Sequence, residues 1–389
     1  MSHINTIFNQ ILHLIPRHQF DNLVRAHSGD RYVKEFTCFR QFITLMYGQI
    51  KGRDSLRDIV TGLNSQRSKF YHIGLQSVAR STLADANNSR DWHIYEGIFN
   101  RLLERCLSVT PKNGFKFDNP FYSLDSTTID LCLSIFPWAK FRKTKGALKI
   151  HCLLDQRGSI PSFVVITKGA KHDIRVAKES DLPLQPDSII AFDRAYIDYE
   201  FLYDLHSRGI YFVTRAKKNL SCTVTGLHKM PPNVKGLVCD MWIRLEGYYQ
   251  SQNYPEELRL IEWHDEATGR DLSFLTNNFK LAASTIAGIY KSRWQIELFF
   301  KWIKQNLKIK SFLGTSVNAV MTQIFVAMCY YLLLTYIKFQ TKYGYTITDL
   351  ARILSEILME RTHLLDILTL KPVQAINRAR DPSDQLTLF

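Results

Sequence analysis

Residues 290–310 read YKSRWQIELFFKWIKQNLKIK, and no other stretch of the 389-residue chain is as informative about its architecture. On an α-helix with about 100° between successive residues, one stripe about 80° wide carries polar side chains, namely Tyr290, Arg293, Glu297, Lys301 and Lys304. The opposite side is apolar and consists of Ile296, Phe299 and Ile303. The pattern therefore predicts an amphipathic helix that packs on a core and presents one carboxylate among cations and a tyrosine.

The cations of this stretch exceed what charge balance requires. Arg293, Glu297 and Lys301 have the spacing of ordinary ion pairs on a solvated helix face, so that simpler interpretation stays open. Four lysines nevertheless follow Glu297 without an intervening acid, namely Lys301, Lys304, Lys308 and Lys310. This excess favours a stripe that contacts phosphate groups.

Two aspartates stand in stretches that otherwise read as buried strands. Asp125 lies within FYSLDSTTIDL, residues 121–131, and Asp193 ends DSIIAFD, residues 187–193. Burial of an unpaired carboxylate is costly, so each must pair with a cation or bind a metal ion. Capping and pairing are the commoner explanations for one such aspartate, but two of them together with Glu297 favour a metal site.

Three carboxylates are a suitable ligand set for hard cations. Mg²⁺ binds a few carboxylate oxygens and keeps coordination positions for water and phosphate. Two such ions about 4 Å apart can activate an attacking oxygen and stabilise a leaving oxygen in phosphodiester cleavage. Asp125, Asp193 and Glu297 are therefore the candidate metal-binding and catalytic residues.

The order of the predicted elements indicates an α/β fold. Residues 1–115 read as helical, whereas residues 148–154 and 160–167 read as a β-hairpin around the turn DQRG. A strand over 187–193, a helix over 198–207 and a strand over 210–214 follow. Residues 218–280 read as a small β-rich insertion, and the chain is helical from residue 281 onward. We expect a catalytic domain over 116–217 and 281–335, and a C-terminal helical segment, 336–389, that is a candidate for oligomerisation.

The N-terminal region offers a candidate DNA-binding motif. Helices are expected over residues 33–49 and 55–63, followed by a short polar helix within 77–90. A helix, a loop and a second polar helix are compatible with a helix-turn-helix, in which Asn87 and Arg90 on the polar side would contact DNA. A plain helical bundle is the alternative.

Composition supports a polyanionic partner. The formal net charge is +14 and the isoelectric point is near 9.4, which is typical of proteins that bind nucleic acid. Most of the basic excess lies in residues 1–120 and 281–389, on either side of a nearly neutral middle. The seven cysteines include no CxxC pair, so we expect buried thiols in a reducing cytoplasm.

One apolar stretch, residues 319–337, is long enough to cross a bilayer. Its sequence, AVMTQIFVAMCYYLLLTYI, lacks charges, but threonine and glutamine dilute it and no second such stretch exists. We therefore expect a helix buried in a large domain and no membrane association.

The two aspartate motifs and the polar stripe of residues 290–304 resemble those of the DDE transposases of bacterial insertion sequences. The spacing Tyr290–x2–Arg293–x3–Glu297–x6–Lys304 is similar to the YREK signature of one large subgroup, and LDSTT resembles its first-aspartate motif. AFDRAY resembles the second-aspartate motif, with Tyr196 in the usual place and Ala195 where glycine is common. The resemblance covers about residues 118–335, and the first 115 residues resemble the helical N-terminal domain less specifically.

The resemblance implies a ribonuclease H-like catalytic domain with a β-rich insertion between the second aspartate and the glutamate. It implies Mg²⁺ or Mn²⁺, two ions in number, held by Asp125, Asp193 and Glu297. Family members bind the terminal inverted repeats of their element, cleave its ends and join them to target DNA as homodimers or higher assemblies. In the YREK subgroup cleavage can pass through a DNA hairpin, and Tyr290, Arg293 and Lys304 would then bind phosphates near the scissile bond.

The resemblance also implies a bacterial cytoplasmic protein that acts at the nucleoid. Trp242 or Trp263 is a candidate to stack on a flipped base, with core packing as the alternative. Asp173 is a candidate for a structural role or a DNA contact. Two other functions stay open at this point: a ribonuclease H-like nuclease without strand transfer, and a non-catalytic DNA-binding repressor of transposition.

Overall fold

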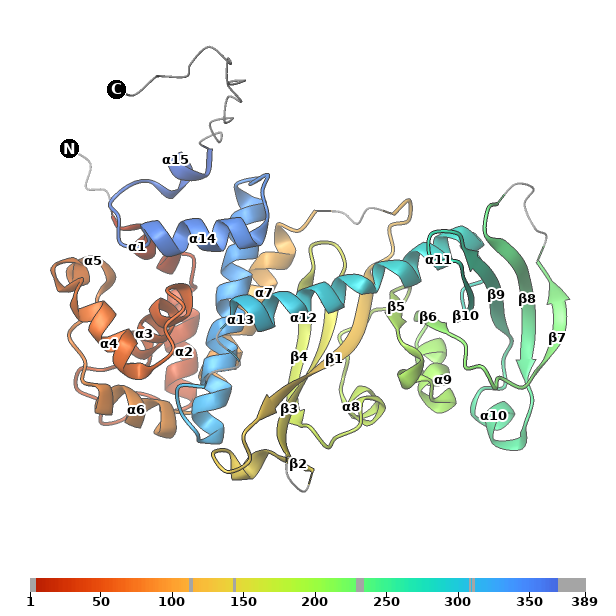
Figure 1. Ribbon diagram of the computed structural model, residues 1–389, viewed down its shortest axis with the longest axis horizontal. Helices are drawn as coiled ribbons and strands as arrows, with labels where there is room; N and C mark the ends of the chain where they lie inside the picture. Colours follow the sequence, from red (N-terminus) through yellow and green to blue (C-terminus); the bar gives the residue numbers. More distant parts are fainter. Residues whose placement is uncertain are drawn as a thin grey trace, which may run out of the picture.

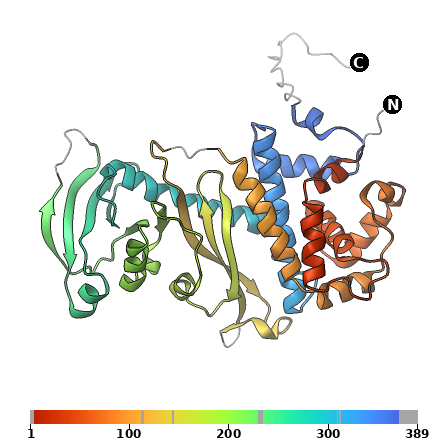
Figure 2. The same cartoon turned by 180° about the vertical axis from the view of Figure 1, so that it is seen from behind.

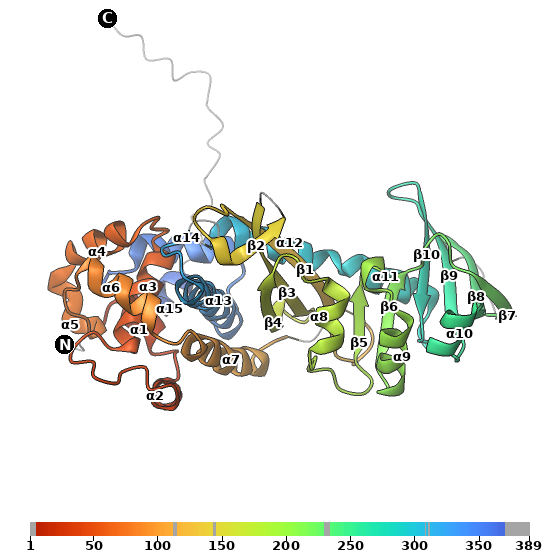
Figure 3. The ribbon, with the colours of Figure 1, turned by 90° about the horizontal axis from the view of Figure 1, so that it is seen from below.

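The computed structural model describes residues 5–111, 115–142, 145–228, 234–307, 309 and 312–369. The molecule is elongated, with helices at one end, a mixed sheet in the middle and the strands of the insertion at the other end (Figures 1 and 3). Helices α11 and α12 run along one face of the sheet and connect the insertion with the helical end (Figure 1).

The helical end is built by the N-terminal part of the chain. Its elements are α1 (Ile7–Leu12), α2 (Arg17–Ala26), α3 (Cys38–Ile50), α4 (Leu56–Asn64), η1 (Arg67–Lys69), α5 (Phe70–Ile73), α6 (Arg80–Ser89) and α7 (His93–Ser108). The sequence predicted a helix from residue 33, but α3 begins only at Cys38. The reason is a local cap, because the Thr37 hydroxyl accepts a hydrogen bond from the backbone N–H of Arg40.

The apolar stretch of residues 319–337 forms the central helix of this end, α13 (Val317–Gln340). It packs against α3, α6 and α7, and Figure 2 shows α7 alongside it. Among the described residues it is the one helix long and apolar enough to cross a membrane, but 89% of its most apolar 18-residue stretch is buried within the protein. Its hydrophobicity is therefore explained by its place in the core.

The C-terminal helices pack against the N-terminal ones. They are α14 (Ile347–Ile357) and α15 (Leu364–Thr369). The backbone N–H groups of Ile7 and Phe8 donate to the carbonyl oxygens of Glu360 and Leu358, at 2.9 and 2.8 Å. The described part of the segment 336–389 therefore completes the same hydrophobic core as the N-terminal helices.

The catalytic half of the sheet has the strand order β4-β3-β1-β5-β6. The strands are β1 (Phe121–Leu131), β2 (Lys140–Arg142), β3 (Lys145–Asp155), β4 (Ile160–Lys168), β5 (Ile189–Phe192) and β6 (Tyr211–Arg215). Antiparallel pairing joins β1 to β3 and β3 to β4, whereas β1, β5 and β6 are parallel neighbours. Helices α8 (Asp173–Glu179) and α9 (Tyr199–Ser207) cover one face, with the short helices η2 (Pro137–Ala139) and η3 (Arg194–Tyr196) in the connections. This arrangement is the ribonuclease H-like fold expected from the sequence.

The insertion continues the same sheet. Its elements are β7 (Cys222–Leu227), β8 (Leu237–Leu245), α10 (Tyr248–Asn253), β9 (Leu258–Asp265) and β10 (Arg270–Thr276). Because β10 pairs with β6, the order runs on as β6-β10-β9-β8-β7. A buried ion pair stabilises this part: Arg259 Nη2 lies 2.6 Å from Asp240 Oδ2, and Arg259 also donates to the carbonyl oxygens of Asn278 and Leu281.

Residues 290–310 span the junction of two helices rather than one. Helix α11 (Ala283–Ser292) ends before Arg293, and α12 (Trp294–Asn306) begins after it. As predicted, the apolar side is buried, with Ile296, Phe299 and Ile303 at 0%, 4% and 0% exposure. This side packs in the core that α13 shares with the sheet.

Candidate active site

Asp125 and Asp193 lie next to each other at the end of two parallel strands. The register of β1 and β5 pairs Leu124 with Phe192, so the residue that follows each of them is one of the two aspartates. Leu124 and Phe192 point into the core under α8 and α9. Because side chains alternate along a strand, Asp125 points to the other face, toward α12.

The carboxylate of Asp193 is held at the start of a short helix. Its Oδ1 accepts a hydrogen bond of 2.8 Å from the backbone N–H of Ala195, so Asp193 caps the helix η3. This bond involves the backbone, so alanine serves at position 195 in place of glycine. The other carboxylate oxygen, Oδ2, is not part of this cap.

Arg293 joins the first aspartate to the glutamate. Its Nη1 lies 3.0 Å from Asp125 Oδ2, and its Nη2 lies 2.7 Å from Glu297 Oε1. The Arg293 side chain is only 14% exposed, against 22% for Asp125 and 34% for Glu297. One guanidinium group therefore bridges a residue of the sheet and a residue of α12.

Electrostatics identify this as a crowded anionic site. The pKa of Asp125 is raised to about 6. Burial is the largest cause and the charges of Asp193 and Glu297 add to it, whereas the Ser126 backbone N–H and Arg293 act in the opposite direction. A carboxyl group whose pKa is raised by burial and by like charges is typical of functional sites.

The residues present fit a hard divalent cation by their chemistry. Asp125, Asp193 and Glu297 offer only carboxylate oxygens, the ligands that Mg²⁺ and Mn²⁺ prefer. In the part of the chain that the structure describes, no three acidic, histidine or cysteine side chains are already arranged around one point suitable for a metal ion. Arg293 supplies the positive charge between Asp125 and Glu297 instead.

A polar network lies behind Asp125 on the opposite face of the sheet. Ser126 Oγ donates to Asp173 Oδ1 at 2.7 Å, and Lys149 Nζ lies 3.1 Å from the same oxygen. The buried ring of His151 is near Asp173 as well, at 3.4 Å, and its Nε2 pairs with Thr167 Oγ1 at 2.9 Å. The sequence predicted a structural role or a DNA contact for Asp173, but not its partners Ser126, Lys149 and His151. The sequence feature that could have indicated this network is the pair Lys149 and His151, which occupy one face of an otherwise apolar strand.

Tyr196 lies close to this network and to the two aspartates. Burial raises the pKa of its phenol well above the usual value, and the carboxylates of Asp173, Asp125 and Asp193 add to that effect. The tyrosine of the AFDRAY motif is thus a core residue close to the carboxylates, and it is only 2% exposed.

The other residues of the polar stripe differ in their contacts and in their burial. Tyr290 packs its ring on Phe274, with centroids 5.2 Å apart, and Arg293 Cζ lies 5.7 Å from the Tyr290 centroid. Lys301 is exposed and Lys304 is half-buried, and both belong to α12. Lys308 and Lys310, the remaining lysines of the predicted stripe, lie outside the described residues.

A cavity of about 690 Å³ opens beside Arg293. Its walls come from β9, β10 and α11, and they include Trp263, Tyr290 and the 56%-exposed ring of Trp294. Of the two tryptophans considered for base stacking, Trp263 therefore lines a cavity next to the site. Trp242 lies elsewhere, with its ring edge-on to Phe279 at 5.9 Å.

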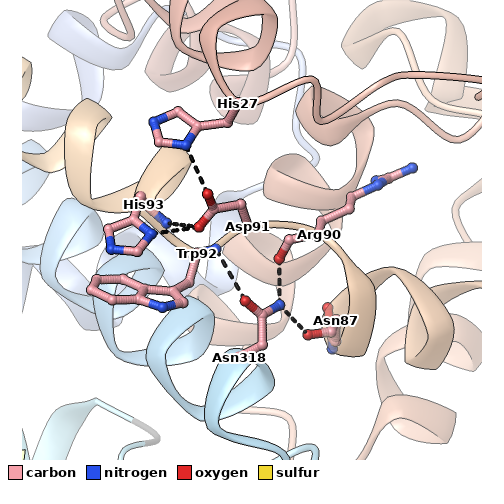
Figure 4. Close-up of polar contacts among 7 residues, drawn as sticks. All are labelled: His27, Asn87, Arg90, Asp91, Trp92, His93 and Asn318. Carbon is pink, nitrogen blue, oxygen red and sulfur yellow. Dashed lines mark hydrogen bonds and ion pairs between the residues drawn. The ribbon is translucent and has the colours of Figure 1, made fainter.

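Asn87 and Arg90 differ from expectation, because both side chains point into the helical end. Asn87 is 3% exposed and accepts a hydrogen bond from Gln41, and Arg90 is 9% exposed and donates to Gln41 and to the Phe36 carbonyl. Asn318 of α13 binds the backbone carbonyls of both residues (Figure 4). Leu83 and Ala86 are buried as predicted, but tertiary packing buries Asn87 and Arg90 as well.

Comparison with known proteins assigns the family. A family model described as "Transposase DDE domain" matches residues 116–333, and another, "Domain of unknown function (DUF4372)", matches residues 3–76. The chain is 30% identical over 270 residues to the "Probable transposase for insertion sequence element IS5377" of Geobacillus stearothermophilus, which covers 69% of this chain and 70% of that protein. The solved piggyBac transposase synaptic complex with hairpin DNA is similar at 11% identity, with a TM-score of 0.44 over 95% of this chain and 81% of that one.

The fold and the relatives define a DNA-cleaving and strand-transferring enzyme of the ribonuclease H-like class. The domain match spans more than half of the chain, so the chain belongs to the DDE transposase family. It is a transposase related to those of bacterial insertion sequences. Its substrate is DNA, and the family generally uses divalent metal ions.

Proposed function

We propose that Asp125, Asp193 and Glu297 are the catalytic carboxylates of this transposase and hold two Mg²⁺ or Mn²⁺ ions. The observation that carries the proposal is the contact of β1, which bears Asp125, with both β5 and α12. The β1–β5 register sets the two aspartates side by side, and Arg293 links Asp125 to Glu297 of α12. The raised pKa of Asp125, caused first by burial, is the electrostatic signature of the same convergence.

The chain's own residues supply positioning and charge. When bound, the two ions activate the attacking oxygen and stabilise the leaving oxygen of the scissile phosphodiester. Asp125 and Asp193 are fixed by the strands, and the helix η3 cap holds one oxygen of Asp193 so that the other can face the ions. Tyr290, Arg293 and Lys304 are proposed to bind the phosphates on either side of the scissile bond.

We assign end recognition to the helical part of the protein. Residues 1–120 carry six more basic than acidic side chains, and this excess suits a surface that binds DNA. Because Asn87 and Arg90 are buried, their contribution is to fix α6 against α3 and α13 rather than to touch bases. The DNA bound there is proposed to be the terminal inverted repeats of the element, on the nucleoid of a bacterial cell.

Cleavage and joining at two ends require two active sites, and we propose a homodimer or a higher assembly on DNA. The C-terminal helices α14 and α15 are engaged within their own subunit, through Leu358, Glu360 and the N-terminal helix α1. Any subunit contact through the described part of this segment, residues 336–369, would use the surface that those helices leave exposed.

A cleavage and joining assay tests the catalytic assignment. The substrate is a duplex carrying one end of the element, with a labelled 3′ strand and a supercoiled plasmid as target. Asp125→Asn, Asp193→Asn and Glu297→Gln should each lower both nicking and joining by at least about a thousandfold, because removal of a ligand disables the charge stabilisation that drives the step. End binding should change little. Retention of nicking by any one of these variants would refute the assignment of that residue.

A further inference from the structure

Arg293 is placed where a metal ion would otherwise neutralise the carboxylates. Its guanidinium group contacts Asp125 and Glu297 at 3.0 and 2.7 Å, and the side chain is largely buried. Its Nε is buried, and among the described residues it has no hydrogen-bond partner. A divalent ion that binds both Asp125 and Glu297 cannot be present together with this bridging guanidinium group. Both would need the same carboxylate oxygens and the same space.

The backbone at Arg293 has the geometry of a hinge. Helices α11 and α12 meet there, and two hydrogen bonds of the tighter 3₁₀ type flank the residue. The Arg293 N–H donates to the Tyr290 carbonyl at 3.2 Å, and the Ile296 N–H donates to the Arg293 carbonyl at 3.0 Å. A short 3₁₀ segment within a helical run often marks a point where the helix can be re-aimed.

A second destination for the guanidinium group lies next to this hinge. The cavity of about 690 Å³ is lined by more basic than acidic side chains: besides Arg293 it has Arg215, Lys235, Arg270 and Lys291, against Asp265 and Glu266. A cavity with this charge attracts a DNA phosphate. A guanidinium group binds phosphate in the same bidentate geometry that it uses with carboxylates. Movement of Arg293 from the carboxylates to a phosphate would therefore preserve its hydrogen bonds.

We propose that Arg293 is a counter-ion that keeps the carboxylate site closed to metal until a DNA phosphate draws the guanidinium group away. The inference rests on the catalytic assignment of Asp125, Asp193 and Glu297 made above. In the DNA-free protein, Arg293 stabilises Asp125 and Glu297 against mutual repulsion. When DNA enters, Arg293 moves to the phosphate and the carboxylates become available to the metal ion.

This exchange makes metal binding and DNA binding mutually dependent. If DNA raises the affinity for metal by some factor, metal raises the affinity for DNA by the same factor. The consequence for function is that a complete, hydrolytically active metal site forms only where a phosphate backbone is already present.

Mn²⁺ titration followed by electron paramagnetic resonance tests the proposal without reference to activity. Mn²⁺ affinity is measured for the full chain alone and bound to a duplex carrying the element's own end. DNA should raise the Mn²⁺ affinity of the parent protein by about tenfold or more, within the usual range of coupling between sites. Arg293→Gln should bind Mn²⁺ without DNA about as tightly as the parent does with DNA, and DNA should add little.

Two further variants make the comparison specific. Lys280→Gln removes one positive charge from an exposed residue just before α11 that does not line the cavity, and it should keep the parent's response to DNA. Arg293→Lys keeps the charge, but a single ammonium group cannot bridge two carboxylates as well, so its Mn²⁺ affinity should be intermediate. Melting temperatures of all variants, measured without metal, confirm that each is folded, and Arg293→Gln should melt lowest of these.

The outcomes separate this proposal from the one on which it rests. If Asp125→Asn and Glu297→Gln bind Mn²⁺ on DNA as the parent does, the carboxylate assignment itself is wrong. If those variants lose Mn²⁺ but Arg293→Gln shows no gain without DNA, only the role of Arg293 is overturned. Equal Mn²⁺ affinity of the parent protein with and without DNA also overturns it.

Discussion

The buried imidazole of His151 gives a pH dependence of stability that can be worked out from the structure. Burial lowers its pKa to about 4, Lys149 and Lys171 act in the same direction, and Asp173 opposes them. An unfolded chain restores a pKa near 6.5. Between these two values the unfolded state binds the additional proton, so the folded state loses stability as the pH falls.

The magnitude follows from the size of the shift. A difference of roughly 2.5 pKa units, at about 1.4 kcal/mol for each unit, corresponds to about 3 kcal/mol. This contribution is fully present above pH 6.5 and is lost between pH 6.5 and 4. His151→Gln keeps a hydrogen-bonding group toward Thr167 but cannot titrate, so it removes the effect.

The assay is urea denaturation followed by tryptophan fluorescence at several pH values from 7 to 4. Carboxylates titrate in the same range, so the informative quantity is the free energy of unfolding of the parent minus that of His151→Gln. This difference should fall by about 3 kcal/mol from pH 7 to pH 4. Substitution of the exposed His172 by Gln is the matched control and should follow the parent. A difference that stays constant with pH would refute the reasoning.

Two further predictions concern the insertion and the lysines of α12. Arg259→Met leaves the carboxylate of Asp240 buried without its cation, so it should lower the free energy of unfolding by about 3–5 kcal/mol in denaturation experiments, whereas a loss below about 1 kcal/mol would contradict a buried pair. Replacement of both Lys301 and Lys304 by Ala should weaken binding to specific and random duplexes alike. It should also reduce the slope of log affinity against log salt by about 2. An unchanged slope would show that these lysines do not contact DNA phosphates.

Short-range patterns account for much of what the sequence predicted. An aspartate inside or at the end of an apolar strand is expensive, and this cost alone singled out Asp125 and Asp193. The helical period of residues 290–310 predicted which side of α12 would be buried, and the structure confirms it for Ile296, Phe299 and Ile303. Strand alternation and turn residues predicted the β3–β4 hairpin.

Features that depend on distant partners were not predictable in the same way. The inward orientation of Asn87 and Arg90 is set by Gln41 and Asn318, which lie far away in the sequence. The break at Arg293 was not predicted either, because the helical period of residues 290–304 runs on across the junction of α11 and α12. Equally, no local pattern indicates that β10 pairs with β6 and extends the catalytic sheet.

A crystal structure of the protein bound to its DNA end with Mn²⁺ tests the central claim most directly, because the anomalous signal locates the metal. We expect manganese about 2.1–2.2 Å from carboxylate oxygens of Asp125, Asp193 and Glu297, with the scissile phosphate beside it. Manganese bound elsewhere, with Arg293 still bridging Asp125 and Glu297 while DNA fills the site, would contradict it.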